Sequence, residues 1–222
     1  MAASGPEEKT QDARDVPPAF DPSPAQMEKL ETYAALLRKW QKAVNLVSPG
    51  TLEALWERHF ADSAQLQRFI PPGSTCLDFG SGAGFPGMVL AVLTDPAAGI
   101  RFHLVESNAR KCAFLHEVAR QTGTAVEIHN ARIEEIARRG TVTQADVIMA
   151  RAVAPLATLF ELSRPFFRSG TVGLFPKGRR AKDEVAEARK AWTFRLRAHP
   201  SATEPGGKVL EVGSLERLEG RT

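Results

Sequence analysis

The segment from Leu77 to Val92, LDFGSGAGFPGMVLAV, restricts most strongly what this chain can fold into. It lies between an apolar run typical of a buried strand and another typical of a helix, and it contains Gly80, Gly82, Gly84 and Gly87. Glycine lets a ligand approach the main chain closely, and a helix N-terminus carries partial positive charge. Because one glycine suffices for a tight turn, four within eight residues favour a ligand-binding loop over a turn alone.

Strand and helix patterns alternate after this loop. The predicted strands are residues 75–80, 101–107, 125–130, 145–150 and 171–178, and the predicted helices are residues 84–93 (with Pro86 in the first turn), 109–123, 132–140, 155–167 and 180–192. Five strand–helix units in series predict a mostly parallel sheet that is covered on both faces. Two further strands, 194–200 and 208–215, predict a closing hairpin with one antiparallel strand. The expected fold class is therefore α/β, a doubly wound seven-stranded sheet.

The segment before the loop predicts helices. Residues 1–24 contain five prolines and five acidic residues, which is typical of a disordered tail. Ser23, Pro24 and Gln26 match the start signals of a helix, and a second helical stretch spans residues 51–69. The predicted organisation is a tail at 1–24, a helical region at 25–72 and an α/β domain at 73–222.

Composition indicates the cellular compartment and the possible partners of the protein. The chain has 222 residues, and its two cysteines, Cys76 and Cys112, lie in apolar runs, which predicts buried thiols in a reducing compartment and no metal site. No apolar run reaches about 20 residues, so we expect a cytoplasmic protein without a membrane partner. The net charge is +3, but residues 164–197 alone carry +7. On charge alone, an ordinary solvated helix explains this stretch better than a phosphate-contacting face.

The acids near the loop indicate which ligand it takes. Gly82, Gly84 and Gly87 spell G-x-G-x-x-G. Glu106 lies at the end of the next predicted strand, where its carboxylate can accept hydrogen bonds from both ribose hydroxyls. A dinucleotide or any adenosine ligand fits this pattern. Asp78 directly precedes the loop, where it could contact the cationic methionine end of S-adenosylmethionine and would repel a pyrophosphate. The pattern therefore favours S-adenosylmethionine over a nicotinamide cofactor.

Several short motifs between about Tyr33 and Gly178 resemble one known family: LLRKWQKAVNLVS, RHFADS, DFGSGAGFPG, ARIEE, ARAVAPL and FPKG. In these motifs the chain resembles the bacterial small-subunit ribosomal RNA guanine-N7 methyltransferases, also called glucose-inhibited division protein B. The loop pattern together with RHFADS is far more specific than a glycine motif alone. Phe79 is bulkier than the expected strand residue, and the resemblance is weak beyond about Arg180.

The resemblance implies a class I, Rossmann-like methyltransferase that transfers a methyl group from S-adenosylmethionine to N7 of a guanine in the 530 loop of 16S ribosomal RNA. The substrate would be the RNA or the small ribosomal subunit, and the enzyme would act as a monomer. Two alternatives stay open: a non-catalytic RNA-binding protein that keeps this fold, and a nicotinamide-dependent oxidoreductase. Because guanine N7 carries a free lone pair at neutral pH, the reaction needs alignment more than a general base.

The resemblance also places functional residues. The family's cofactor contacts fall on Gly80, Phe85, Ile133, Glu134 and Arg151, which join the residues predicted from the loop itself: Asp78, Gly82, Gly84 and Glu106. Without the resemblance, Ile133 and Glu134 would be assigned to an ordinary amphipathic helix. Arg151 and His59 are the candidates for a catalytic role, although Arg151 could be a surface ion-pair partner and His59 an interhelical residue. The predicted RNA contacts are Arg58, Lys177, Arg179, Arg180 and Lys182.

Overall fold

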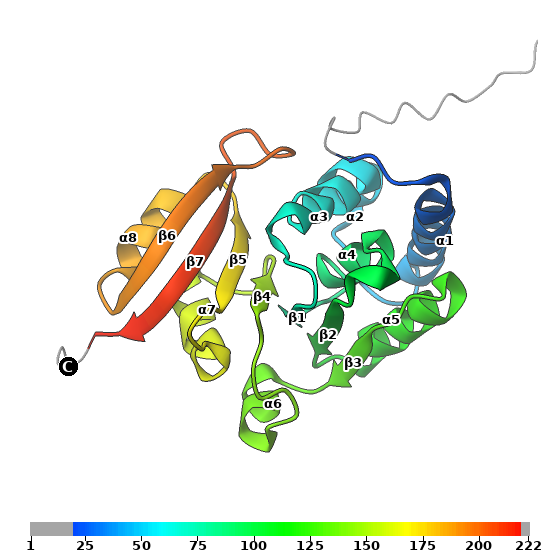
Figure 1. The fold of residues 1–222 in the computed structure, drawn as a ribbon. Helices are drawn as coiled ribbons and strands as arrows, with labels where there is room; N and C mark the ends of the chain where they lie inside the picture. Colours follow the sequence, from blue (N-terminus) through cyan, green and yellow to red (C-terminus); the bar gives the residue numbers. More distant parts are fainter. Residues whose placement is uncertain (1–19, 219–222) are drawn as a thin grey trace, which may run out of the picture.

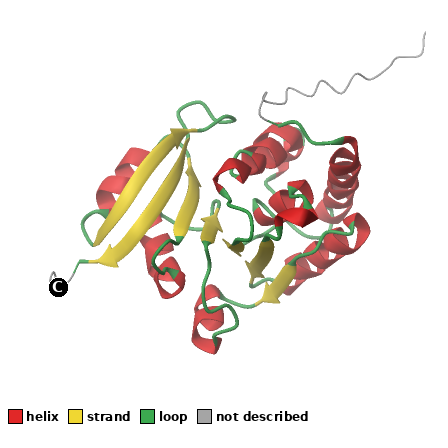
Figure 2. Ribbon diagram, in the orientation of Figure 1, coloured by secondary structure: helices red, strands yellow, loops and turns green. Residues whose placement is uncertain are grey.

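The computed structural model describes residues 20–218, which form one seven-stranded sheet with helices on both sides (Figures 1 and 2). The spatial order of the strands is β3-β2-β1-β4-β5-β7-β6. Their bounds are β1 Thr75–Phe79, β2 Arg101–Glu106, β3 Glu127–Asn130, β4 Val147–Ala150, β5 Val172–Lys177, β6 Trp192–Pro200 and β7 Lys208–Arg217. The first five strands pair in parallel, and β7 runs antiparallel between β5 and β6. The predicted fold class is confirmed.

The helices of the described residues fall into two groups along the chain. Those before and beside the glycine loop are α1 Pro24–Gln41, α2 Pro49–Leu52, a π-helical segment Trp56–Ala61, α3 Asp62–Ala64, α4 Gly87–Leu93 and α5 Ala109–Thr122. Those that follow are α6 Ile133–Arg139, α7 Leu156–Ser163 and α8 Ala181–Ala188. Short 3-10 turns cover Gln67–Phe69, Pro96–Ala98 and Arg164–Phe166.

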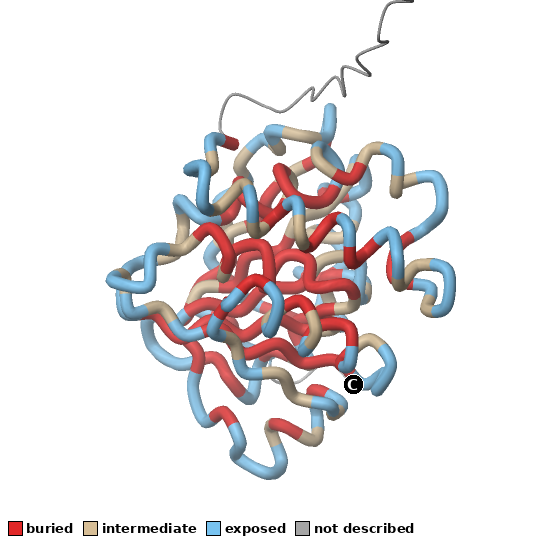
Figure 3. The backbone as a smooth tube through the Cα atoms, turned by 90° about the vertical axis from the view of Figure 1, so that its right-hand side faces the viewer, coloured by how far each residue is buried: buried red, intermediate tan, exposed pale blue. Residues whose placement is uncertain are grey.

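Successive residues of the central strands pack against helices on opposite faces of the sheet. Leu77, Phe79 and Val105 pack with the later helices α6, α7 and α8, whereas Leu104 packs on the opposite face with α1, α4 and α5. This alternation follows from the pleat of a strand, in which successive side chains point to opposite faces. The buried segments accordingly run through the centre of the molecule, with exposed segments around them (Figure 3).

The N-terminal helices share the core of the sheet. The predicted start of α1 is confirmed, because Ser23 Oγ accepts from the Gln26 backbone amide at 3.3 Å and Gln26 Oε1 accepts from the Ser23 amide at 2.9 Å. Tyr33 is fully buried against residues of α4 and α5. The predicted tail overlaps the described residues only at 20–24, where Phe20 is buried and Pro24 begins α1; residues 1–19 lie outside the described residues.

Several predicted helices and strands differ from the structure. The helix predicted over 51–69 is broken into short pieces, and its π-helical turn buries His59, Phe60 and Ala61 in succession, which a regular α-helix would spread over more of its circumference. Pro86 precedes α4 and does not lie in its first turn. Trp192 begins β6 and does not end a helix, because an alternation of buried and exposed residues starts there.

Both cysteines are buried free thiols, as expected, and burial raises the pKa of the Cys76 thiol to about 12. Within residues 20–218, none of the helices has the length and apolar character that a membrane crossing requires.

Candidate functional site

The glycine loop connects β1 to α4 at the carboxyl end of the sheet. Gly80, Gly82 and Gly84 adopt φ of +59°, +59° and +94°, a region that other residues rarely enter. A Cβ atom at Gly84 would overlap the Tyr33 hydroxyl, whereas one at Gly82 would have only the Gly80 carbonyl oxygen nearby, at 3.7 Å. The glycine at position 84 therefore allows Tyr33 to pack closely against the loop, and the glycine at position 82 leaves space above the loop.

Asp78 lies beneath the loop, not at its surface. Its side chain is fully buried, and Oδ2 accepts a hydrogen bond from the Gly87 backbone amide at 3.1 Å. Among the described residues, its Oδ1 is buried without a hydrogen-bond partner. Burial raises the pKa of Asp78 to about 7, against the lowering effect of hydrogen bonds from Ser81 and Gly87. A cationic group near the loop would favour the ionised carboxylate.

Glu106 joins the loop to the end of β2. One carboxylate oxygen accepts from the Gly82 backbone amide at 2.9 Å, and the other accepts from the Asn108 amide at 2.7 Å. The two amides fix the orientation of the carboxylate, while each oxygen keeps a second lone pair. Beside it lies a cavity of about 210 Å³, which we call the loop cavity, lined by Gly80, Val105, Glu106, Ile133, Glu134 and Val153 among others.

A larger hollow of about 520 Å³, which we call the basin, lies between the N-terminal helical region, the loop after β4 and the β6–β7 hairpin. Its lining includes Arg58, His59, Asp62, Arg151, Lys177 and Arg180. Val153 lines both the basin and the loop cavity, and 37% of its surface is exposed. The two spaces therefore meet at one apolar side chain. The preceding residue, Ala152, has a φ of +55°, which is strained for a residue with a Cβ atom.

Arg151 is the centre of a hydrogen-bond network on the wall of the basin. Its guanidinium donates to the Arg58 carbonyl oxygen at 2.8 Å, to Asp62 Oδ2 at 3.1 Å and to His59 Nδ1 at 2.7 Å. It also lies 5.0 Å from the centroid of the Phe85 ring. The side chains of Arg151 and Asp62 are only 16% and 15% exposed. This largely buried ion pair joins the end of β4 to the N-terminal helical region.

His59 is held as a neutral ring. Because an arginine can only donate, Nδ1 is the acceptor, and Nε2 therefore carries the proton and donates to Thr51 Oγ1 at 2.9 Å. Burial, followed by the charges of Arg151 and Arg58, lowers the pKa of His59 to about 3. Its ring stacks on Phe85 with centroids 4.7 Å apart, and Tyr33 stacks on Phe85 at 5.8 Å. Phe85 is 5% exposed, so its ring faces are not free for a ligand.

Asp62 connects the wall of the basin to the β6–β7 hairpin. Its Oδ1 accepts from Thr203 Oγ1 at 2.6 Å and from Gln65 Nε2 at 2.8 Å. Gln65 Oε1 in turn accepts from the Ala202 backbone amide at 2.9 Å. The loop of residues 201–207 is thereby fixed against the N-terminal helical region.

The basic residues at the end of β5 and just after it differ in how strongly their charges are engaged. The Lys177 ammonium is an ion-pair partner of Glu184 at 2.8 Å and donates to the Ala154 carbonyl oxygen at 2.7 Å, and its side chain is only 9% exposed. Arg179, Arg180 and Lys182 are exposed. Lys177 thus ties β5 to the loop after β4, while the other three present their charges to solvent.

The structure gathers part of the predicted cofactor set around the loop cavity: Gly80, Glu106, Ile133 and Glu134 line it, and Gly82 donates to Glu106. Asp78, Gly84 and Phe85 support the loop from below and line neither space, and Arg151 lines the basin. Sequence reasoning did not single out Val153 or Thr203. The ARAVAPL motif contains Val153, but nothing in the sequence indicates that it separates two spaces.

Comparison with known proteins identifies the family. The rRNA small subunit methyltransferase G family (GidB) matches residues 26–208. The chain is 48% identical over 190 residues to a Ribosomal RNA small subunit methyltransferase G of Methylorubrum extorquens, covering 86% of this chain and 89% of the relative. It is 48% identical over 204 residues to the protein of that name from Rhodospirillum centenum, covering 91% of each. This chain belongs to the rRNA small subunit methyltransferase G family.

Solved structures agree at the level of the fold. An O-methyltransferase from Bacillus cereus in complex with SAH superposes with a TM-score of 0.56 at 15% identity, covering 88% of this chain and 93% of the other. Aeropyrum pernix fibrillarin gives a TM-score of 0.53 at 18% identity, covering 70% and 75%. Family membership confirms the predicted methyltransferase activity and S-adenosylmethionine as its cofactor, and it sets aside the nicotinamide-dependent and non-catalytic alternatives.

Proposed function

We propose that this enzyme transfers the methyl group of S-adenosylmethionine to N7 of a guanine in the 530 loop of 16S ribosomal RNA, acting as a cytoplasmic monomer on the RNA or the small subunit. The observation that carries the proposal is the junction of the two spaces at Val153. A cofactor in the loop cavity and a nucleotide in the basin would meet at this residue. The target atom and the RNA loop come from the family resemblance.

The residues of the loop cavity fit the cofactor. Glu106 presents lone pairs that can accept from a ribose diol, Gly82 leaves the main chain open, and Ile133 offers an apolar surface for the adenine. Asp78 does not line the cavity, but its Oδ1, which has no hydrogen-bond partner among the described residues, places a buried acid below the loop, and its charge would favour a cationic methionine end. Phe85 and Gly84 would act through the main chain or through packing, because their side-chain positions are buried.

The basin fits an RNA substrate. Arg58 and Arg180 are exposed at its rim, and Arg179 and Lys182 extend the positive surface beyond it. Such contacts would position the RNA through its phosphates without reading its sequence. Lys177 would hold the loop from which these residues project, because its ammonium is engaged with Glu184 and Ala154.

The bound cofactor supplies an electrophilic methyl group on sulfur. In the reaction the N7 lone pair forms the bond to the methyl carbon, the carbon–sulfur bond breaks, and the positive charge passes from sulfur to the purine, so no proton needs to leave. The protein has to align the two groups and exclude water. Neutral His59 and engaged Arg151 suit this role, because they shape the wall of the basin without acting as a base.

The proposal is tested by mass mapping of modified nucleosides in ribosomal RNA from cells that lack the protein. We expect N7-methylguanosine to be missing at one position of the 530 loop and to return when the gene is restored. Titration calorimetry should also rank S-adenosylmethionine and S-adenosylhomocysteine far above NAD. An unchanged modification map in the deletion strain would contradict the proposed target while leaving the family assignment in place.

A further inference from the structure

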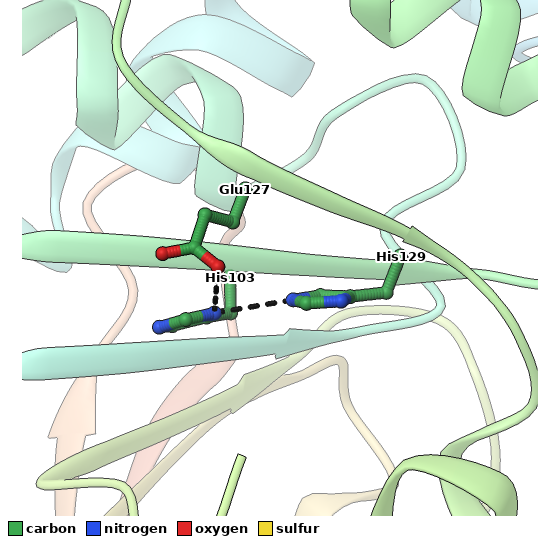
Figure 4. A group of neighbouring side chains, drawn as sticks. All are labelled: His103, Glu127 and His129. Carbon is green, nitrogen blue, oxygen red and sulfur yellow. Dashed lines mark hydrogen bonds and ion pairs between the residues drawn. The ribbon is translucent and has the colours of Figure 1, made fainter. Parts of the chain in front are cut away.

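Two histidines and a glutamate meet at the edge of the sheet, away from both the loop cavity and the basin. His103 Nδ1 lies 3.1 Å from His129 Nε2 and 3.5 Å from Glu127 Oε2, and the three ligand atoms all lie within 4.8 Å of one another. The Glu127 carboxylate and the His129 imidazole both point toward the His103 ring (Figure 4). We propose that this cluster binds a late first-row divalent metal ion, Zn²⁺ in the first place, which fastens the edge strand β3 to β2.

Sheet register explains why the three side chains converge. His103 of β2 pairs with Glu127 of β3, and His129 is two residues further along β3 on the same face. Ile128, which alternates with them, packs on the other face toward the core that contains α5. The cluster therefore lies on the face of β2 and β3 opposite α5, where Glu127 keeps 64% of its side-chain surface exposed. An ion can reach it from solvent.

The spacing of the ligand atoms suits tetrahedral zinc. Zn–N and Zn–O distances of about 2.0–2.2 Å place neighbouring ligand atoms of a tetrahedron about 3.3–3.6 Å apart. The measured separations of 3.1 Å and 3.5 Å are close to this edge length. Two imidazoles with one carboxylate form an attested zinc ligand set that leaves the fourth position to water. Without a metal, one ring nitrogen donates its proton to the other in a hydrogen bond, and the metal would replace this proton.

The surroundings do not oppose a cation strongly. Arg101 is the nearest basic residue on this face of β2, but its guanidinium donates to Thr75 Oγ1 of β1 at 2.7 Å and so points away from β3. Glu127 supplies a carboxylate 3.5 Å from His103 Nδ1, and this negative charge attracts a cation.

The expected consequence is a firmer edge of the sheet. The β3 strand has four residues and one neighbouring strand, and Ala131, which directly follows it, lines the loop cavity and donates through its amide to the Glu106 carbonyl oxygen at 3.2 Å. A metal bridge between β2 and β3 would stabilise this segment by binding only the folded state.

Titration calorimetry of the full chain with ZnCl₂, after chelator treatment, tests the proposal. We expect one equivalent of zinc to bind and to raise the melting temperature. His103→Asn and His129→Asn should each weaken binding more than the roughly 10–100-fold typical of an outer-shell partner. The matched control is His116→Asn, an exposed histidine on α5, which should leave the affinity unchanged.

X-ray absorption of the zinc-loaded wild-type chain requires no variant and guards against misfolding. It should show two imidazole nitrogens on the metal at one equivalent. Zinc affinity equal in the wild type and in the His103→Asn/His129→Asn double variant would overturn the proposal. A first-equivalent spectrum without two imidazoles would do the same.

Discussion

The loop cavity and the basin are built in different ways. Backbone amides and glycines shape the loop cavity, and its one buried charged side chain, Glu106, is oriented by the amides of Gly82 and Asn108. The basin is shaped by side chains from distant segments, above all by the contacts of Arg151 with Asp62 and His59. A site that is shaped by the backbone tolerates many side-chain substitutions on its surface, but it tolerates few substitutions of its glycines. A site built from an ion-pair network depends on every partner, so single substitutions should separate the two.

The largest effect is expected in the basin. Arg151→Ala removes three hydrogen bonds, one of which is the largely buried ion pair with Asp62, so it should lower the free energy of unfolding by about 3–5 kcal/mol. Urea unfolding followed by circular dichroism measures this change. Arg179→Ala is the control, since this exposed residue should change stability by no more than about 0.5 kcal/mol. Equal, small losses in both variants would show that the network contributes nothing to the fold.

Glu106→Gln should affect the loop cavity and not the basin. The substitution keeps the shape but removes the charge that we propose accepts from the ribose, so S-adenosylmethionine should bind more weakly by about 1–3 kcal/mol. Titration calorimetry measures the affinity, and Glu53→Gln, an exposed glutamate, serves as control. An RNA affinity that falls as much as the cofactor affinity would contradict the separation of the two spaces.

The basic residues at the end of β5 and just after it should divide into two classes. Replacing Arg179, Arg180 and Lys182 with alanine should reduce the log–log salt slope of RNA binding by up to about one unit for each lost phosphate contact, at constant cofactor affinity. Filter binding at several salt concentrations measures the slope. Lys177→Ala should instead destabilise the fold, because its ammonium is buried in a pair with Glu184. If all four residues change the slope alike, Lys177 is free in solution.

The smallest effect is expected from pH. His59, with a pKa of about 3, stays neutral throughout the range from pH 6.5 to 8.5. At saturating S-adenosylmethionine, whose cationic end favours the ionised form of Asp78, single-turnover methylation rates should therefore vary less than about threefold over this range, well below the contribution of a general base. A sigmoidal rise that disappears in His59→Gln would assign a catalytic proton to this residue.

The same residue predicts the sign of the stability change in acid. The folded chain holds His59 below its usual pKa of 6.5, so between about pH 3 and 6.5 the unfolded chain binds a proton that the folded chain does not. This contribution to stability is complete above about pH 6.5 and is lost as the pH falls toward 3. His59→Gln should lose less stability than the wild type between pH 7 and pH 4.5 in urea unfolding.

Sequence patterns predicted the loop cavity better than the basin. The order of strands and helices, the glycine loop and Glu106 all follow from local motifs that lie next to each other in the fold. The basin depends on contacts such as Asp62 with Thr203, which no local pattern encodes. The burial of Phe85 between His59 and Tyr33 could not be predicted from the sequence either, because it depends on how the N-terminal helices pack above the loop.

Strand register brings together residues that lie far apart in the sequence. No metal site was expected, because His103 and His129 lie 26 residues apart and no close ligand spacing joins them. Only the pairing of β2 with β3 brings them together. The helix predicted up to Trp192 overlooks that apolar side chains occupy every second position at Trp192, Phe194 and Leu196. This alternation predicts a strand.

The bond between Asp62 and Thr203 joins residues 141 positions apart, and Gln65 reaches Ala202 across 137. During synthesis the N-terminal helical region leaves the ribosome long before the hairpin that completes its hydrogen bonds. Contacts of such long range slow folding, because the intervening chain must be ordered first. The wall of the basin is therefore complete only when the hairpin of the last two strands has been made, and a nascent chain that stops before residue 201 lacks the contacts that hold Asp62 and Gln65 to this hairpin.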